Sequence, residues 1–383
     1  MSPSGHDPAV TIGALKGLVL PASDVAGRSS KAADRPLVSI IIPAFNAADT
    51  LESCLRSVAA LDSPNCETIV VCDGCSDGTV EVARSFGVRV IENDSQEGAA
   101  YSRNVGAAAA TGDIFFFVDA DCVLATDAVS IAVEALVGGE NVVFGSYIAE
   151  TSVPGFFSRF KNYQHHFTHQ QAIGRPTSFW SGCGAINRSA FEDLRGFDVT
   201  LQACEDIEFG YALTRRGYEI QLLKSMQAEH LKRYNLRRWM NSDLFGRAVP
   251  WTRLAVSGRA ALGKLNTIAR GKASVAAVGL AGLFAVAAPF QPLALVGTAM
   301  CCALVLALNR GLLAFLMERR SLLFAAGGAL ALLVHFLICG TGYVLGRMAP
   351  RYPNERSPAP QYAWSEHSSG EAARSDVVTV KSS

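Results

Sequence analysis

The stretch Phe115-Phe116-Phe117-Val118-Asp119-Ala120-Asp121-Cys122 is an apolar, aromatic run that ends abruptly in two aspartates one residue apart. A run without alternation is typical of a parallel strand that is buried on both faces. The two carboxylates then follow the carboxyl end of the strand, which is where open α/β sheets bind ligands. Carboxylate oxygens suit Mg²⁺ or Mn²⁺, and such an ion would bridge a diphosphate. The alternative is a strand-end turn that carries two solvated acids.

Predicted strands and helices alternate along the first two thirds of the chain. The predicted strands are 38–43, 68–72, 88–91, 114–118, 141–148 and 218–223. The predicted helices are 47–60, 79–85, 98–110, 127–136, 155–171 and 205–216. Strands that alternate with helices at this spacing indicate right-handed βαβ units. We therefore expect an α/β fold around a mostly parallel, Rossmann-like sheet.

Composition restricts the class of protein. The 383 residues have a formal net charge of zero, so no nucleic-acid surface is expected. Half of the residues are hydrophobic, and the excess lies after Lys272. The ten cysteines show no disulfide-framework spacing, so we expect reduced thiols in a cytosolic environment.

The C-terminal third predicts membrane helices. Residues 273–308 are almost wholly apolar, and a single helix of that length would overshoot a hydrocarbon core of about 30 Å. The segment Pro289-Phe290-Gln291-Pro292 would turn it into a hairpin. Residues 322–345 are a third candidate span, and the arginines in 309–320 are expected to face the cytoplasm. The sequence leaves two or three spans open.

The predicted helix at 155–171 carries an aromatic stripe with basic side chains beside it. The stripe consists of Phe156, Phe157, Phe160, Tyr163 and Phe167, and three histidines lie next to it. Such a helix could lie on a membrane surface, line an acceptor site or simply face the core.

Several of these stretches together resemble the family 2 glycosyltransferases, over roughly residues 37–245. The segment Val38-Ser39-Ile40-Ile41-Ile42-Pro43-Ala44-Phe45-Asn46 resembles the strand and loop that hold the nucleotide, which implies contacts from Pro43, Phe45 and Asn46. The segment Cys72-Asp73-Gly74-Cys75-Ser76-Asp77-Gly78-Thr79 resembles the family's Asp-Asp-Gly-Ser-x-Asp-Gly-Thr turn, with cysteines at the first and fourth positions. Asp73 then stands where the family contacts uracil or guanine.

Three further motifs of the family follow in the same order. Gly98, Arg103, Asn104 and Gly106 match the Gly-x-x-x-x-Arg-Asn-x-Gly helix that packs near the diphosphate. Asp119 and Asp121 match the Asp-x-Asp motif, which implies a metal ligand at Asp121 and a ribose or metal contact at Asp119. The pair Glu205-Asp206 matches the pair whose Asp is the catalytic base. His230 would complete the metal shell or contact phosphate, or be a surface-loop histidine.

The resemblance implies a GT-A nucleotide-sugar-binding domain followed by C-terminal transmembrane helices. We expect a disordered leader at 1–36, the GT-A domain at 37–245 and a juxtamembrane linker at 246–272. Transmembrane helices are expected at 273–346 and a disordered tail at 347–383.

The expected function is inverting, Mg²⁺- or Mn²⁺-dependent transfer of one hexose from a UDP- or GDP-sugar. The acceptor is expected to be lipid-linked or a glycan. The chain is expected to cross the membrane several times, in contact with membrane lipids. Its catalytic domain is expected to face the cytoplasm. Asn235-Leu236-Arg237-Arg238-Trp239 resembles the Gln-x-x-Arg-Trp motif of processive polysaccharide synthases but has Asn for Gln. A processive synthase and a non-catalytic nucleotide-sugar-binding membrane subunit are the alternatives.

Overall fold

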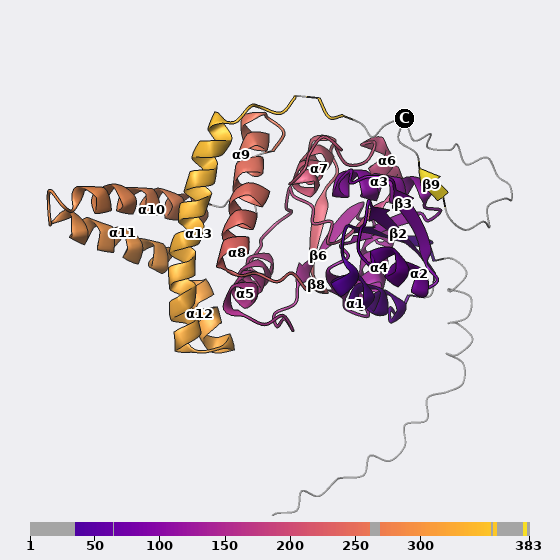
Figure 1. Ribbon diagram of the computed structural model, residues 1–383, viewed down its shortest axis with the longest axis horizontal. Coiled ribbons are helices and arrows are strands. Elements are labelled where there is room, and N and C mark those ends of the chain that lie inside the picture. The colour runs from indigo at the N-terminus through magenta and orange to yellow at the C-terminus, as the bar shows by residue number, and fades with distance from the viewer. Residues whose placement is uncertain (1–34, 64, 261–268, 354, 358–377, 381–383) are drawn as a thin grey trace, which may run out of the picture. The chain divides into compact units, whose positions relative to one another are not determined.

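The computed structural model describes residues 35–63, 65–260, 269–353, 355–357 and 378–380. The expected leader lies outside these residues up to position 34, as does most of the expected tail. Figure 1 shows a sheet with helices on both faces and, beyond it, a group of C-terminal helices.

A mixed sheet of nine strands forms the centre of the fold, in the order β5-β8-β6-β7-β4-β1-β2-β3-β9. The strands are β1 (Val38–Ala44), β2 (Cys66–Asp73), β3 (Arg89–Asn93), β4 (Ile114–Val118), β5 (Cys122–Leu124), β6 (Val142–Tyr147), β7 (Cys183–Asn187), β8 (Ile220–His230) and β9 (Val378–Val380). The pairs β4–β1, β1–β2 and β2–β3 are parallel, as predicted, whereas β7 is antiparallel to both β4 and β6. Because the strand order reverses between β1 and β4, a ligand crevice is expected at the carboxyl ends of these two strands.

The helices surround this sheet and extend beyond it. They are α1 (Ala48–Ala59), α2 (Thr79–Ser85), α3 (Ala99–Ala109), α4 (Ala128–Val137), α5 (Phe156–Gln170), α6 (Arg188–Asp193), α7 (Glu205–Arg215), α8 (Leu236–Asp243), the π-helix η2 (Leu244–Ala248), α9 (Val249–Val256), α10 (Ala269–Ala287), α11 (Ala294–Leu308), α12 (Arg310–Arg319) and α13 (Leu322–Met348).

Side-chain alternation on the buried strands builds two core layers. On β4, Phe116 points to the layer shared with α1 and α4, whereas Phe115 and Phe117 point to the opposite layer. Phe115 packs edge-on against Phe191 at 5.4 Å between ring centroids, and Phe117 packs edge-on against Phe197 at 5.3 Å. The apolar run therefore fills both faces of the sheet, and its carboxyl end is held rigidly where the aspartates follow.

Two helices, α10 and α13, are long and apolar enough to cross a membrane. The bent pair α11–α12 would make a third span if its two parts are counted as one, with a bend of 67°. A separate apolar cluster joins α12 and α13 to α5 and to the buried Trp239 of α8.

Most of residues 246–260, within the expected juxtamembrane linker, are helical. This segment continues α8 as η2 and α9, and Pro250 stands in the first turn of α9, where its missing N–H is tolerated. Arg259 is fully buried and donates to Asp198, and it lies 3.2 Å from Glu208, which is also buried. Sequence reading missed this because the segment is mixed in polarity and its partners are distant in sequence.

We predict that Arg259→Ala destabilises the folded protein by about 3–5 kcal/mol, because it leaves Asp198 and Glu208 buried with one cation fewer. The free energy of unfolding, measured by denaturant titration in detergent, checks this. Arg216→Ala is the matched control, since it breaks an exposed pair with Asp193 and should leave stability unchanged. Equal stability of the two variants would contradict the prediction.

Candidate active site

One buried cation joins three separate parts of the chain. Arg103 of α3 donates one hydrogen bond to Oδ1 of Asp119 and one to Oε1 of Glu205, both at 2.7 Å. Its side chain is only 4% exposed. Burial lowers the pKa of Arg103, but the two carboxylates outweigh burial and raise it. The guanidinium therefore stays charged and fixes the end of β4 beside the start of α7.

The predicted metal ligands lie together. Asp119 directly follows β4, and its backbone carbonyl accepts a hydrogen bond from the Cys122 amide at 2.9 Å. This hydrogen bond closes a turn that places Asp121 beside the end of β8. His230 ends β8 and pairs with Cys122, which puts its Nε2 3.3 Å from Oδ1 of Asp121. One ligand atom from each of Asp119, Asp121, Cys122 and His230 lies within 4.8 Å of the others.

The chemistry of this group suits a hard divalent cation. Burial raises the pKa of Asp121, but His230 and Lys232 outweigh burial and lower it to about 2, so the carboxylate is ionised. Burial raises the pKa of the Cys122 thiol well above its usual value, and soft sulfur is in any case a poor ligand for a hard cation. Two carboxylates and one imidazole remain, a set that fits Mg²⁺ or Mn²⁺.

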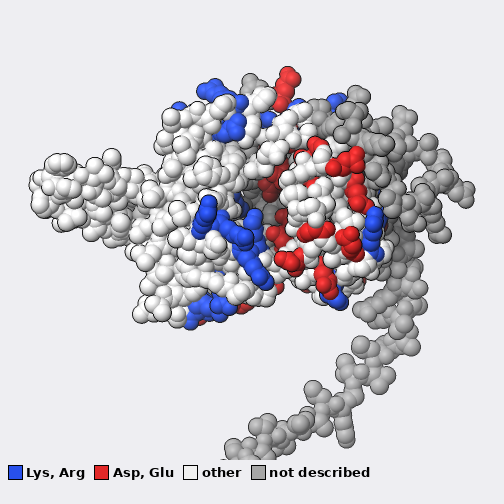
Figure 2. All heavy atoms as spheres, in the orientation of Figure 1, with Lys and Arg blue, Asp and Glu red and all other residues white. Residues whose placement is uncertain are grey.

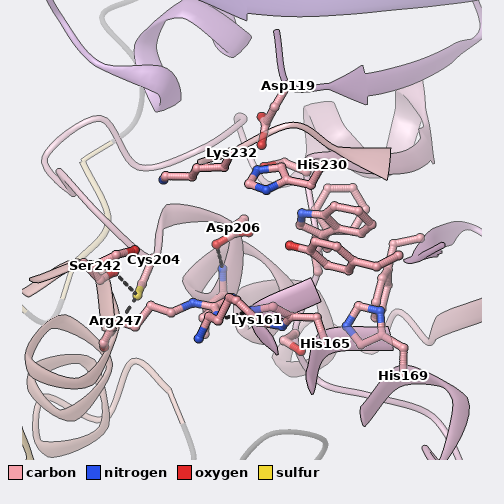
Figure 3. Close-up of a pocket in the computed structure, with 18 of the residues that line it drawn as sticks. Asp119, Lys161, His165, His169, Cys204, Asp206, His230, Lys232, Ser242 and Arg247 are labelled. Carbon is pink, nitrogen blue, oxygen red and sulfur yellow. Dashed lines mark hydrogen bonds between the residues drawn. The ribbon is translucent and has the colours of Figure 1, made fainter. Parts of the chain in front are cut away.

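Asp206 lies in the first turn of α7, next to Glu205. Burial raises the pKa of its carboxyl, the negative Glu205 raises it further, and Arg103 partly offsets both, which gives a pKa of about 7. Cys204 adopts a left-handed conformation with φ of 60° just before the helix. Figure 3 shows the Asp206 side chain inside the pocket, between Lys232 above it and Arg247 below.

The pocket around Asp206 has a volume of about 260 Å³ and two unlike walls. Asp119 and His230 lie on the sheet side, and α5 and η2 supply the wall that carries Lys161, His165 and Arg247 (Figure 3). Arg247 donates to Nε2 of His165 at 2.8 Å. Burial, and then the neighbouring Arg247, lower the pKa of His165 well below its usual value, so the ring is neutral.

An aromatic stack also lines the pocket. The rings of Tyr147 and Trp180 stack at 4.3 Å between centroids, and His165 stacks on the same tyrosine at 4.9 Å. No motif pointed to Tyr147, Trp180 or Arg247. The one sequence signal was the histidines beside the aromatic stripe of 155–171: two of them, His165 and His169, line the pocket.

The other predicted nucleotide contacts lie at the carboxyl ends of β1 and β2. Pro43 is near the end of β1, and Phe45 and Asn46 follow it exposed. Asn46 has a positive φ of 47°, and its Oδ1 accepts from the Ser76 amide at 2.9 Å, which ties this loop to the turn after β2. The exposed Phe45 ring is therefore available to a ligand at this edge.

Asp73 and Asn104 have partners inside the protein. The carboxylate of Asp73 is buried and accepts from the amides of Glu97 and Gly98 at 3.1 and 2.8 Å and from Asn93 at 2.8 Å. These bonds hold the loop into α3, where Gly98 has φ of 100°. The Asn104 amide group bonds both the N–H and the C=O of Phe197 at 2.8 Å. In this arrangement both side chains support backbone beside the site.

Comparisons with known proteins agree with this geometry. The sequence profile described as glycosyl transferase family 2 matches residues 39–195. Glycosyltransferase AglE of Haloferax volcanii is 37% identical over 94 residues, which are 23% of this chain and 31% of that protein. Glycosyltransferase GlyG of Streptococcus pneumoniae is 26% identical over 161 residues, which are 40% of this chain and 54% of that protein. The chain thus spans about a third to a half of these relatives.

A solved structure shares the fold. It is described as mannosyltransferase PcManGT from Pyrobaculum calidifontis in complex with GDP-Man and Mn²⁺, and it is 19% identical. The likeness has a TM-score of 0.53 and covers 85% of this chain and 92% of that one. The predicted GT-A fold is confirmed.

We predict that Asp206→Asn stabilises the folded protein at pH 8. A carboxyl with a folded pKa of about 7 holds its proton more tightly in the folded than in the unfolded state, so stability is lost as the pH rises from about 4 to 7. Asparagine cannot ionise, so the variant should be more stable at pH 8 by on the order of 1–3 kcal/mol and converge with the native protein near pH 4.

Denaturant titrations at the two pH values measure the difference directly. Asp193→Asn is the control, because its ion pair with Arg216 lowers the pKa of Asp193 and its loss should bring no gain at pH 8. An Asp206→Asn variant that is no more stable than the native protein at pH 8 would show that Asp206 has an ordinary pKa.

Proposed function

We propose that the protein is a glycosyltransferase that acts at the cytoplasmic face of a cell membrane, because residues 39–195 match the profile described as glycosyl transferase family 2. It moves one sugar from a UDP- or GDP-sugar to a lipid-linked or glycan acceptor. The observation that carries the proposal is the convergence of Asp119, Asp121, His230 and Asp206, held by Arg103, at one edge of the sheet.

In this proposal Asp121, Asp119 and His230 would hold Mg²⁺ or Mn²⁺, and such an ion would supply positive charge to neutralise the leaving diphosphate. One oxygen of Asp119 is already occupied by Arg103, so its other oxygen is the one that meets the ion or the ribose. Gly182 leaves room there, because a Cβ at that position would lie 2.9 Å from Oδ2 of Asp119.

Asp206 is the proposed general base. The acceptor oxygen attacks the anomeric carbon, the bond from that carbon to the diphosphate oxygen breaks, and the acceptor's proton passes to the Asp206 carboxylate. One base and attack from the face opposite the leaving group invert the anomeric centre. A pKa of about 7 places this carboxyl near the operating pH, which favours proton transfer.

The nucleotide is proposed to lie at the ends of β1 and β2. Phe45 offers an exposed ring there, while Pro43 and Asn46 shape the same loop. In this proposal Gly98, Arg103 and Asn104 have a positioning role, because their hydrogen bonds hold the amino end of α3 and the residues after β4 next to the nucleotide. Asp73 acts through the loop that it holds, because its carboxylate is buried and already accepts three hydrogen bonds.

Two observations favour single transfer to a lipid-borne acceptor. The pocket wall that carries Lys161 and Arg247 belongs to α5 and η2, and these elements pack against the apolar C-terminal helices. Trp239, the tryptophan of the motif that resembles processive synthases, is fully buried and stacks on Phe157 at 5.3 Å. It therefore serves the core between α5 and α8, which weakens the argument for processive synthesis.

We predict that Asp206→Asn lowers the rate of sugar transfer about 10²–10⁴-fold and leaves nucleotide binding intact, because only the proton acceptor is lost. Transfer of labelled sugar into an organic-phase lipid measures the rate, and calorimetric titration with the nucleoside diphosphate and Mn²⁺ measures binding. The control is Asp127→Asn, because Asp127 directly precedes α4 and its side chain makes no capping hydrogen bond. This variant should transfer sugar at the native rate. Loss of nucleotide binding in Asp206→Asn would refute the assigned role.

A further inference from the structure

The last helix, α13, is the longest of the helices described above and was expected to include the third membrane span. Its 27 residues extend about 40 Å at 1.5 Å per residue, more than the roughly 30 Å of a hydrocarbon core. A helix that crosses a bilayer leaves its two ends on opposite sides. The contacts at the two ends of α13 therefore decide whether it crosses.

The amino end of α13 is attached to the catalytic domain. Arg320, just before the helix, lies 2.7 Å from Glu150 and donates to the Tyr163 hydroxyl at 2.7 Å. Phe324 packs on Phe156 of α5 at 5.0 Å between ring centroids. At Gly327 a Cβ would come within 2.9 Å of that same Phe156 ring, so helix and domain are in close contact.

The carboxyl end of α13 is attached to the same domain. Added Cβ atoms at Gly342 and Gly346 would lie 2.3 Å from Ala248 and 2.6 Å from Thr252, so the helix lies directly on η2 and α9. After the helix, the Tyr352 amide donates to Ser257 at 2.9 Å. Arg356 then pairs with the buried Glu208 of α7 at 3.1 Å.

The middle of α13 is attached as well. Nδ1 of His335 lies 3.0 Å from Oδ2 of Asp243, the last residue of α8, whose other oxygen pairs with Lys161. Figure 1 shows α13 running beside α8 and α9, with the α10–α11 hairpin projecting from its far side. The whole length of α13 is thus covered on one side by α5, α8, η2 and α9, of which α5, α8 and η2 also line the pocket.

The opposite side of α13 is an exposed apolar stripe. Leu323, Leu330, Leu337 and Val344 are all large, exposed and seven residues apart, so they share one face of the helix. On a helical wheel this face lies opposite the one that contains Gly328, His335, Gly342 and Gly346. A helix with one face on protein and the other a continuous apolar stripe fits the boundary between a protein and a lipid surface.

The hairpin differs from α13 in both charge and attachment. Residues 273–309 contain no charged side chain, and in Figure 2 the projecting hairpin is white. Its two ends are joined by the hydrogen bond from Asn309 to Ser274 at 3.0 Å. After it, α12 returns to α5, where Phe315 stacks on His166 at 5.8 Å. The chain therefore leaves the domain and comes back to it through the hairpin.

Charge supports the same arrangement. Arg319 and Arg320 precede α13, and Arg347 and Arg351 end or follow it. Arginines that flank membrane segments stay on the cytoplasmic side, which places both ends of α13 there.

We propose that α13 lies in the plane of the membrane surface, with its stripe of Leu323, Leu330, Leu337 and Val344 in the lipid, and that only the α10–α11 hairpin enters the bilayer. The inference rests on the proposed membrane anchoring but does not depend on the reaction. It places both flanks of α13 on the catalytic side. It also sets the pocket wall of α5 and η2 directly above the lipid surface, within reach of an acceptor that is carried by a lipid.

Depth measurements on the full-length protein in lipid vesicles test the proposal. An environment-sensitive fluorescent amino acid is incorporated in turn at Leu323, Leu330, Leu337 and Val344, and brominated lipids of defined depth quench it. Leu283 of the hairpin is the positive control and Val137, exposed on α4 of the catalytic domain, is the negative control. We expect one shared shallow depth for the four stripe positions, about 5–10 Å into the interface, and a deeper position for Leu283.

Each other outcome has a distinct meaning. A depth that rises to a maximum at Leu330 and Leu337 and falls toward Leu323 and Val344 would show that α13 crosses the bilayer, which overturns the inference and leaves the proposed function standing. Quenching at none of the positions, Leu283 included, would overturn the membrane anchoring itself and the inference with it.

Discussion

The buried guanidinium of Arg103 is the constraint on which the site depends. A cation with 4% exposure is tolerated only when carboxylates face it, and Asp119 and Glu205 each supply one at 2.7 Å. The two carboxylates lie 86 positions apart in the sequence, one at the end of β4 and the other at the start of α7. Burial and the neighbouring Glu205 raise the pKa of the Asp206 carboxyl to about 7, and Arg103 partly offsets both effects. The next residue, Asn104, secures the same junction through the backbone of Phe197.

Much of the fold is predictable from sequence because its signals are local. Apolar runs such as 38–44 and 114–118 are bounded by turn residues, and they alternate with helical spacings, which fixes the parallel half of the sheet. The proximity of Asp119, Asp121 and Asp206 was also predictable, since all three stand in motifs. The order of β5 to β8 was not, because antiparallel pairing across long connections leaves no periodic signal.

The second wall of the pocket could not be predicted, for a physical reason. Tyr147, Trp180 and Arg247 come from three segments whose proximity results only from tertiary packing.

The orientation of α13 was not predictable either. The apolar composition of residues 322–345 predicts that the segment avoids water, but it does not distinguish a helix that crosses the bilayer from one that lies on its surface. The contacts of Gly342, Gly346 and His335 with the catalytic domain supply that distinction. The bonds that the Asp73 carboxylate accepts from Asn93 and from the loop before α3 were likewise not predictable from its motif.

The proposed activity requires that the group around Asp121 binds a nucleoside diphosphate through a divalent cation. Thermal unfolding of the detergent-solubilised protein with UDP or GDP, with and without Mn²⁺, measures this directly, because a ligand that binds only the native state raises the Tm. We predict that one of the two nucleotides raises the Tm only when Mn²⁺ is present, and that Asp121→Asn abolishes the shift. A nucleotide shift of equal size without Mn²⁺ or in Asp121→Asn, or no shift with either nucleotide in folded protein, would contradict the claim.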